Sequence, residues 1–124
     1  MNKFADVNNM LKLYFDGLYY SDPKKLQLVF HPLAIYASAD ETPLLYRTMS
    51  DYFEVVSKRE SPASRQEVRT DVVEQIQFAG ENTAFARVRC SIGTRDFVDF
   101  LTLVRTETTW QIMAKVFQIT ERQQ

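Results

Sequence analysis

The sequence predicts an α+β fold in which helices gather on one side of an antiparallel sheet. Two observations predict it: helical spacing of apolar residues is confined to residues 3–59, and strand-like alternation fills residues 67–120. A chain that passes from helices into consecutive strands joined by tight turns is typical of this class. Its 124 residues fit one domain, so we expect a single domain over residues 1–124.

Three helices are predicted in the first half of the chain. The first covers about residues 3–20, because its apolar residues recur three and four positions apart on one face. These residues are Phe4, Val7, Leu11, Tyr14 and Leu18. Asp22 and Pro23 suit the N-cap and the first turn of a second helix over residues 23–30, which the His31-Pro32 pair ends. The third helix covers about residues 48–59, because Thr48 and Asp51 have the spacing of a capping box.

Strands are predicted for most of the remaining chain. A short strand covers residues 33–38, and four long strands cover residues 67–79, 83–92, 96–105 and 110–120. The tight connections contain Gly80-Glu81-Asn82, Gly93-Thr94-Arg95 and Glu107-Thr108. Glu74 falls in phase with inward apolar residues, and a β-bulge at Val72-Val73 would turn it outward.

Asp99 and Lys115 share one face of the last predicted hairpin. If residues whose numbers sum to 214 are paired, the two lie directly opposite each other. The opposite face then holds Val98, Phe100, Thr102, Val104, Trp110, Ile112, Ala114 and Val116. Either the acid and the base lie at a solvated edge, where an ion pair contributes little, or both point into a cavity between sheet and helices. In the second case burial demands their pairing and marks a place for a polar group of a ligand.

Composition and charge exclude several classes of function. Sixteen acidic and fifteen basic residues give a net charge of −1, which favours neither nucleic acid nor an anionic membrane as a partner. No apolar run is long enough for a bilayer span or a signal peptide, so we expect a cytoplasmic protein. Cys90 is the only cysteine, no Gly-rich phosphate loop occurs, and no ligand set for a metal has the required spacing. We therefore expect neither a metal nor a cofactor.

Three segments carry a resemblance to a known superfamily. They are YSDPKKLQLVFHP at residues 20–32, FVDFLTLVR at residues 97–105 and WQIMAKVF at residues 110–117. Over nearly its whole length the chain resembles the NTF2-like superfamily, and it is most similar to the small bacterial SnoaL-like and lumazine-binding group. The resemblance implies a cone in which three N-terminal helices pack on a curved, mostly antiparallel sheet and enclose a pocket. Because one fold hosts many functions, it leaves the activity open.

The superfamily includes ketosteroid isomerase, whose carboxylic acids have tuned acidity. The resemblance places Tyr14 where that enzyme has its oxyanion tyrosine and Asp99 where it has its protonated acid. It places Ser38 where the enzyme has its general base, and a serine without a base partner does not abstract a carbon-bound proton efficiently. Asp40 would substitute only if the end of the strand differed. Related dehydratases and cyclases of this superfamily use a histidine in similar pockets, and His31 is the only histidine here.

Two interpretations are open for His31 and for Tyr14. His31 either caps a helix end or faces water, or it serves a pocket as a proton-transfer group. Tyr14 either has its hydroxyl bonded locally inside the core or directs it at a ligand. Cys90 lies among small apolar residues and is expected to be an inert buried thiol.

The leading hypothesis is a domain that binds an unidentified small molecule in a pocket between helices and sheet. The expected lining is Tyr14, Leu18, His31, Tyr52, Phe53, Asp99, Leu101, Met113 and Lys115. The alternative is a lyase, isomerase or cyclase acting on a small apolar carbonyl compound, with Tyr14, His31 and Asp99 as candidate catalytic residues. On either hypothesis the apolar outer face of the sheet predicts a homodimer.

Overall fold

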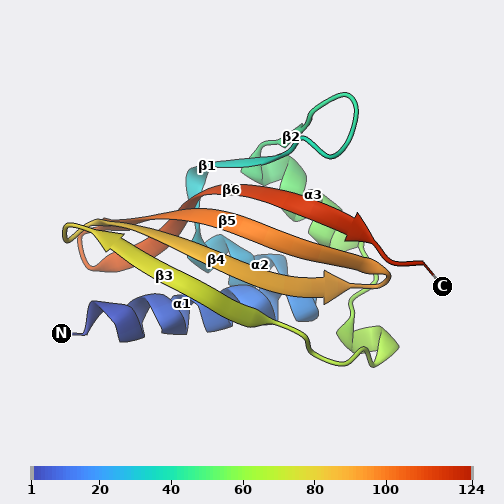
Figure 1. Ribbon diagram of the computed structural model, residues 1–124, viewed down its shortest axis with the longest axis horizontal. Coiled ribbons are helices and arrows are strands. Elements are labelled where there is room, and N and C mark those ends of the chain that lie inside the picture. The colour runs from blue at the N-terminus through green and yellow to red at the C-terminus, as the bar shows by residue number, and fades with distance from the viewer. Residues whose placement is uncertain (1, 124) are drawn as a thin grey trace.

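The computed structural model, which describes residues 2–123, has three helices on a six-stranded sheet and confirms the predicted α+β class (Figure 1). The helices are α1 (Lys3–Tyr19), α2 (Pro23–Val29) and α3 (Met49–Lys58). The strands are β1 (Phe30–Ser38), β2 (Leu45–Arg47), β3 (Val72–Ala79), β4 (Thr83–Ile92), β5 (Arg95–Thr106) and β6 (Thr109–Glu121). A short 3₁₀ turn at Ala63–Arg65 follows α3 and leads to the long strands.

Side-chain caps start α2 and α3 at the predicted places. Asp22 Oδ1 accepts the backbone N–H of Lys24 at 3.0 Å, and Pro23 occupies the first turn of α2. Thr48 Oγ1 accepts the backbone N–H of Asp51 at 3.1 Å at the start of α3. Each such cap satisfies an otherwise unpaired backbone donor and contributes about 1 kcal/mol. These local signals fix where the two helices begin.

The sheet has the strand order β2-β1-β6-β5-β4-β3. Neighbouring strands run antiparallel except β1 and β6, which pair in parallel. The chain therefore leaves α2 at Phe30 and enters the sheet beside its last strand. This pairing places Tyr36 of β1 next to Lys115 of β6. Two segments far apart in the sequence thus meet at the centre of the inner face.

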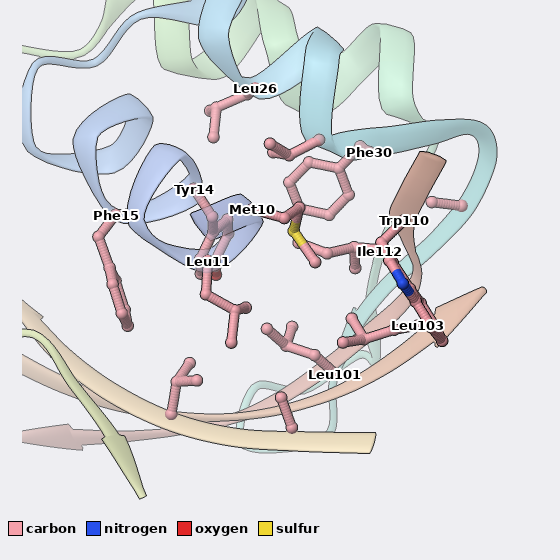
Figure 2. Close-up of a cluster of buried hydrophobic side chains, with 14 of the residues drawn as sticks. Met10, Leu11, Tyr14, Phe15, Leu26, Phe30, Leu101, Leu103, Trp110 and Ile112 are labelled. Atoms are coloured by element: carbon pink, nitrogen blue, oxygen red, sulfur yellow. The ribbon is translucent and has the colours of Figure 1, made fainter. Parts of the chain in front are cut away.

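The core lies between the helices and the inner face of β4, β5 and β6. Figure 2 shows Leu11 and Tyr14 of α1 facing the sheet, with Leu101 and Leu103 of β5 below them. Each large apolar side chain that is buried in this way contributes about 1.5–3 kcal/mol. Gly17 allows α1 and α2 to approach closely, because a Cβ atom there would lie 2.6 Å from Cδ2 of Leu26. Helix-on-sheet packing is therefore dense over this part of the molecule.

The register of the last hairpin differs from the predicted one. Asp99 lies opposite Phe117, and Lys115 lies opposite Leu101, so the acid and the base are diagonal rather than directly paired. The register then shifts by one residue between Thr102 and Leu103, because β6 has an extra residue at Met113. This bulge turns Trp110 and Ile112 into the core, and their predicted place on the outer face is wrong.

Three element boundaries also differ from the expectations. The second helix ends at Val29, and β1 already begins at Phe30 instead of residue 33, because Phe30 has extended backbone angles. The short strand β2 has no alternating pattern long enough to predict it. The strand predicted from residue 67 begins at Val72. The register of β3 shifts between Val73 and Gln75, at Glu74. Glu74 forms ion pairs with Arg87 and Arg89, which is the outward placement expected from a bulge.

Candidate functional site

A buried carboxylate stands at the centre of the inner face of the sheet. Asp99 of β5 has no exposed surface. Its Oδ2 accepts the hydroxyl hydrogen of Tyr14, on α1, at 2.6 Å. The alternation of β5 turns Asp99 to the same side as Leu101 and Leu103, and Tyr14 lies on the apolar stripe of α1 that packs on them. Helix and sheet are thus joined by a short hydrogen bond to a charged group.

Lys115 of β6 completes the polar group beneath the helices. Its Nζ lies 4.0 Å from Asp99 Oδ2, and the residue is only 5% exposed. Four aromatic rings surround the ammonium, each with its centroid 5.2–5.5 Å from Nζ. They belong to Tyr14, Tyr36, Tyr52 and Phe117. Ring faces attract a cation, so this cage offsets part of the cost of removing the ammonium from water. We call Tyr14, Tyr36, Tyr52, Asp99, Lys115 and Phe117 the interior cluster.

The interior cluster alters the acidity of its members. Burial, and then the charge of Asp99, raise the pKa of the Tyr14 hydroxyl well above its usual value. Burial raises the pKa of Tyr52 as well, against the opposing effect of Lys115. Burial alone would lower the pKa of Lys115, but the Asp99 carboxylate together with Tyr52, Tyr36 and Cys90 outweighs it and raises that pKa. Both hydroxyls therefore stay protonated and Lys115 stays charged at neutral pH.

Two polar atoms of the interior cluster are buried without a hydrogen-bond partner. They are Oδ1 of Asp99 and the hydroxyl of Tyr52. A buried polar group left unpaired costs about 1–3 kcal/mol, and most proteins leave few of them. One of these atoms accepts hydrogen bonds, and the other can both donate and accept. A hydroxyl, amide or water in contact with either atom would satisfy it.

Several other predicted pocket residues surround this cluster or lie outside it. Leu18 and Leu101 are buried in the core, and Phe53 packs against its margin beside Tyr52. Met113 is half-buried at the β6 bulge. His31 is not part of the interior cluster: its Nδ1 accepts the backbone N–H of Leu33 at 3.1 Å at the start of β1. This contact is a local turn of the backbone rather than a site for proton transfer.

The residues that a catalytic mechanism requires are otherwise engaged. The Tyr14 hydroxyl donates to Asp99, so in this arrangement it is not free to donate to an oxyanion. Ser38 is fully buried, and its Oγ accepts the backbone N–H of Asp40. The Asp40 carboxylate accepts the backbone N–H of Ile119 at 2.8 Å.

Tyr36 and Phe117 are parts of the cluster that the predicted pocket lining omitted. Tyr36 stacks on Tyr52 with ring centroids 4.5 Å apart and contacts Phe117 at 4.9 Å. Phe117 shares the alternation of Lys115, so the strand pattern contained the signal for it. Tyr36 reaches the site through the parallel pairing of β1 with β6, for which no local signal exists.

The hollows at the surface stop short of the interior cluster's polar groups. Over residues 2–123, none of the five hollows described is lined by Tyr14, Tyr52, Asp99 or Lys115. A small one of about 10 Å³, lined in part by Leu18 and Cys90, has room for about one water molecule. A molecule larger than water therefore reaches Asp99 only if a covering element moves.

Comparisons with known proteins agree with the fold. The sequence profile of a family described as "Putative lumazine-binding" matches residues 2–118. No curated protein matches the chain. Within residues 2–123, no helix has both the length and the apolar character needed to cross a membrane.

Solved structures with the same fold cover almost the whole chain. An NTF2-like protein of unknown function from Shewanella baltica has a TM-score of 0.85 at 20% identity, covering 97% of this chain and 95% of its own. Another from Silicibacter pomeroyi has a TM-score of 0.81 at 19% identity, covering 97% and 100%. A ketosteroid isomerase-like protein from Erwinia carotovora atroseptica has a TM-score of 0.73 at 9% identity, covering 95% and 96%. Because the family profile covers residues 2–118, the protein belongs to the family described as "Putative lumazine-binding", and its fold is that of the NTF2-like structures.

Proposed function

We propose that the protein binds a small, flat, polar molecule at the interior cluster. The observation that carries this proposal is the pair of unpartnered buried atoms, Asp99 Oδ1 and the Tyr52 hydroxyl. An acceptor oxygen and a hydroxyl in one cluster that also contains aromatic rings are complementary to a ring compound that carries donors and acceptors. The ligand would supply the hydrogen bonds that these two atoms lack in the free protein. Each bond of this kind would contribute to the binding energy.

The family name supplies a first candidate for the ligand. Lumazine is a flat bicyclic ring with carbonyl oxygens next to N–H groups. An N–H group would donate to Asp99 Oδ1, and a neighbouring carbonyl would accept from the hydroxyl of Tyr52. The rings of Tyr36 and Tyr52 supply aromatic surface on which such a ring would stack. The same donor and acceptor pattern fits related bicyclic heterocycles, so lumazine is the probe rather than the assigned ligand.

Entry of such a ligand would require α3 to move. Tyr52 is carried by α3, whose main backbone neighbours are α2, β1 and β2. Its buried side consists of Met49, Tyr52 and Val56. A small outward shift of this helix would separate Tyr52 from the sheet and leave Asp99 and Tyr14 in place. Binding would then be slower than diffusion allows, because the opening step precedes it.

Titration calorimetry with lumazine tests the proposal. We expect measurable binding to the unmodified protein and a loss of at least about tenfold in affinity for Asp99→Asn, which is the effect of one charge-assisted hydrogen bond. Asp96→Asn is the matched control, because Asp96 lies on the same strand but pairs with Ser91 and Arg122 outside the cluster. Equal affinities of the Asp99→Asn variant and the unmodified protein would contradict the proposal.

We also propose a homodimer formed through the outer face of the sheet. Phe100 and Val116 are 48% and 49% exposed there, and a hollow of about 270 Å³ between them is also lined by Val98 and Phe117. Phe85 packs edge-on against Phe100 at 5.3 Å. The two arginines beside these residues, Arg87 and Arg89, both pair with Glu74, which offsets one of their two positive charges. An apolar face on a β-sheet is suited to a second copy related by twofold symmetry.

Analytical ultracentrifugation tests the dimer. We expect a dimer at micromolar concentration and a monomer for Phe100→Asp, because a charge on each copy would be buried at the interface. Tyr20→Asp, an exposed aromatic position at the end of α1, serves as the control and should remain dimeric. A monomer of the unmodified protein at these concentrations would overturn this part of the proposal.

A further inference from the structure

Arg59 carries two buried donors that nothing in the structure satisfies. It is the residue that ends α3, and its Nε and Nη2 atoms are both buried without a hydrogen-bond partner. None of the ion pairs formed within residues 2–123 includes it. Arg59 is half-buried as a residue, but these two donors of its charged group are out of water without an acceptor, which is costly. An acceptor is therefore expected at this position when the protein is functional.

The two unpaired atoms define the shape of that acceptor. In a guanidinium group the N–H of Nε and one N–H of Nη2 point in parallel along the same edge. Two parallel donors of this kind match the two oxygens of a carboxylate, which they hold in a bidentate arrangement. A neutral carbonyl or hydroxyl oxygen would occupy only one of the two donors.

Arg59 lies on the same side of α3 as Tyr52 of the interior cluster. The two are seven residues apart, which is about two helical turns and about 10 Å of rise. Burial raises the pKa values of Tyr52 and Cys90, and the charge of Arg59 partly offsets both effects, as expected for a guanidinium facing the same interior.

Asp99, Lys115 and Arg59 together have one positive charge in excess, which a single anionic group would balance. Asp99 contributes one negative charge, whereas Lys115 and Arg59 contribute two positive charges. Lys115 is neutralised by Asp99 at 4.0 Å, and the charge of Arg59 remains. An anionic group placed at Arg59 would restore neutrality, which a neutral ligand would not.

We infer that the ligand is a small aromatic carboxylic acid whose carboxylate is held by Arg59 and whose far end carries a hydroxyl group. This inference rests on the proposed function and narrows its ligand class. The hydroxyl donates to Asp99 Oδ1 and accepts from Tyr52, which satisfies both unpartnered atoms with one group. The ring between the two ends lies against the aromatic side chains of the interior cluster.

The probes for this inference differ by one group at a time. 4-Hydroxycinnamate carries both ends, 4-hydroxycinnamamide replaces the carboxylate by a neutral amide, and cinnamate lacks the hydroxyl. We expect the unmodified protein to bind 4-hydroxycinnamate at least about tenfold more tightly than either of the other two, the effect of one lost charge-assisted contact.

Two variants of Arg59 distinguish the contribution of its two parallel donors to affinity from the contribution of its positive charge. Arg59→Gln should lower the affinity for 4-hydroxycinnamate about tenfold or more and leave that for the amide unchanged. Arg59→Lys keeps the charge without the parallel donors and should lose most of the same affinity. Lys58→Gln is the matched control, because Lys58 is the exposed neighbour at the end of the same helix, paired with Glu54. The Nε–H resonance of Arg59, followed by NMR on adding the acid, reports the contact directly.

The outcomes separate this inference from the proposed function. Equal affinity for the acid and the amide, or an equal effect of Arg59→Gln on both, would overturn the carboxylate assignment. Failure of 4-hydroxycinnamate to bind at millimolar concentration would overturn it as well. If lumazine still bound and Asp99→Asn weakened that binding, the proposed function would stand without it.

Discussion

The hydroxyl of Tyr14 donates to Oδ2 of Asp99 at 2.6 Å, and this bond joins α1 to the centre of the sheet. Neither atom is accessible to water. In water both groups would be fully solvated, so their burial is tolerated only because each satisfies the other. The bond uses the hydroxyl hydrogen of Tyr14, which is the only donor of that side chain. It leaves Asp99 Oδ1 as the acceptor without a partner.

Removing this hydroxyl should destabilise the protein without altering its fold. Tyr14→Phe deletes a hydrogen bond to a charged group and leaves Asp99 Oδ2 with Lys115 as its remaining partner. We expect a loss of about 1.5–3 kcal/mol in the free energy of unfolding, measured by urea denaturation. Tyr20→Phe, at an exposed tyrosine at the end of the same helix, should change stability by less than about 0.5 kcal/mol. Equal effects of the two changes would contradict a specific role for the bond.

The Asp99–Lys115 pair should show strong coupling. Lys115→Met leaves the buried carboxylate without its counter-ion, which costs about 3–5 kcal/mol in comparable buried pairs. The double variant Asp99→Asn with Lys115→Met has no buried charge left in the pair and keeps an acceptor for Tyr14. We therefore expect the double variant to be more stable than the sum of the single effects predicts, by about 1–3 kcal/mol. Strict additivity in a double-mutant cycle would show that the two charges do not interact.

Stability should fall at alkaline pH. The pKa values of Lys115 and Tyr14 are raised in the folded protein above the ordinary values of 10.5 and 10.0. Above about pH 10 the unfolded chain therefore loses these protons while the folded protein retains them. The stabilisation is complete below the unfolded pKa values and is lost as the pH rises toward the folded ones.

Urea denaturation between pH 8 and pH 11 measures this effect. The free energy of unfolding should decline above about pH 10, and the decline should be shallower in Lys115→Met and in Tyr14→Phe. Lys58→Met, which removes an exposed lysine, should leave the slope unchanged. A slope that is the same in all four proteins would mean that other groups cause the alkaline loss.

The thiol of Cys90 should react slowly in the folded protein. Burial, and then the charge of Asp99, raise the pKa of Cys90 to about 12, so very little thiolate exists at pH 8. We expect alkylation by iodoacetamide to be at least about a hundredfold slower in the native protein than in urea, because only the thiolate is nucleophilic. A native rate close to that of the unfolded chain would show that the thiol is accessible and ionised.

The side-chain alternation of the strands already predicts the centre of the site. Asp99 and Lys115 are both odd-numbered in one hairpin, and the predicted and observed registers differ by two residues at these positions. A shift of two changes the partner but not the face, so the acid and the base still share one face, and in the structure both are buried. The bulge at Met113 then reverses the faces of Trp110 and Ile112. Nothing in the local sequence marks that bulge.

The remaining parts of the site depend on contacts between distant segments. Tyr36 reaches Lys115 through a parallel pairing between β1 and β6, and parallel partners have no connecting turn that could reveal them. Arg59 was unremarkable in the sequence, as a charged residue at the end of an amphipathic helix. Only its two unpartnered atoms in the folded structure distinguish it from Lys58. His31 had the right composition for a site, but a backbone contact at the start of β1 places it elsewhere.

The effect of Tyr52→Phe on stability and on binding, measured together, tests the account most directly. The Tyr52 hydroxyl is buried and has no hydrogen-bond partner within residues 2–123, so its removal should leave the free energy of unfolding unchanged or raise it by up to about 1 kcal/mol. The same change should weaken the binding of lumazine or 4-hydroxycinnamate at least about tenfold. A variant that is clearly less stable yet binds as the unmodified protein does would show that the hydroxyl serves the fold and that the interior cluster is no ligand site.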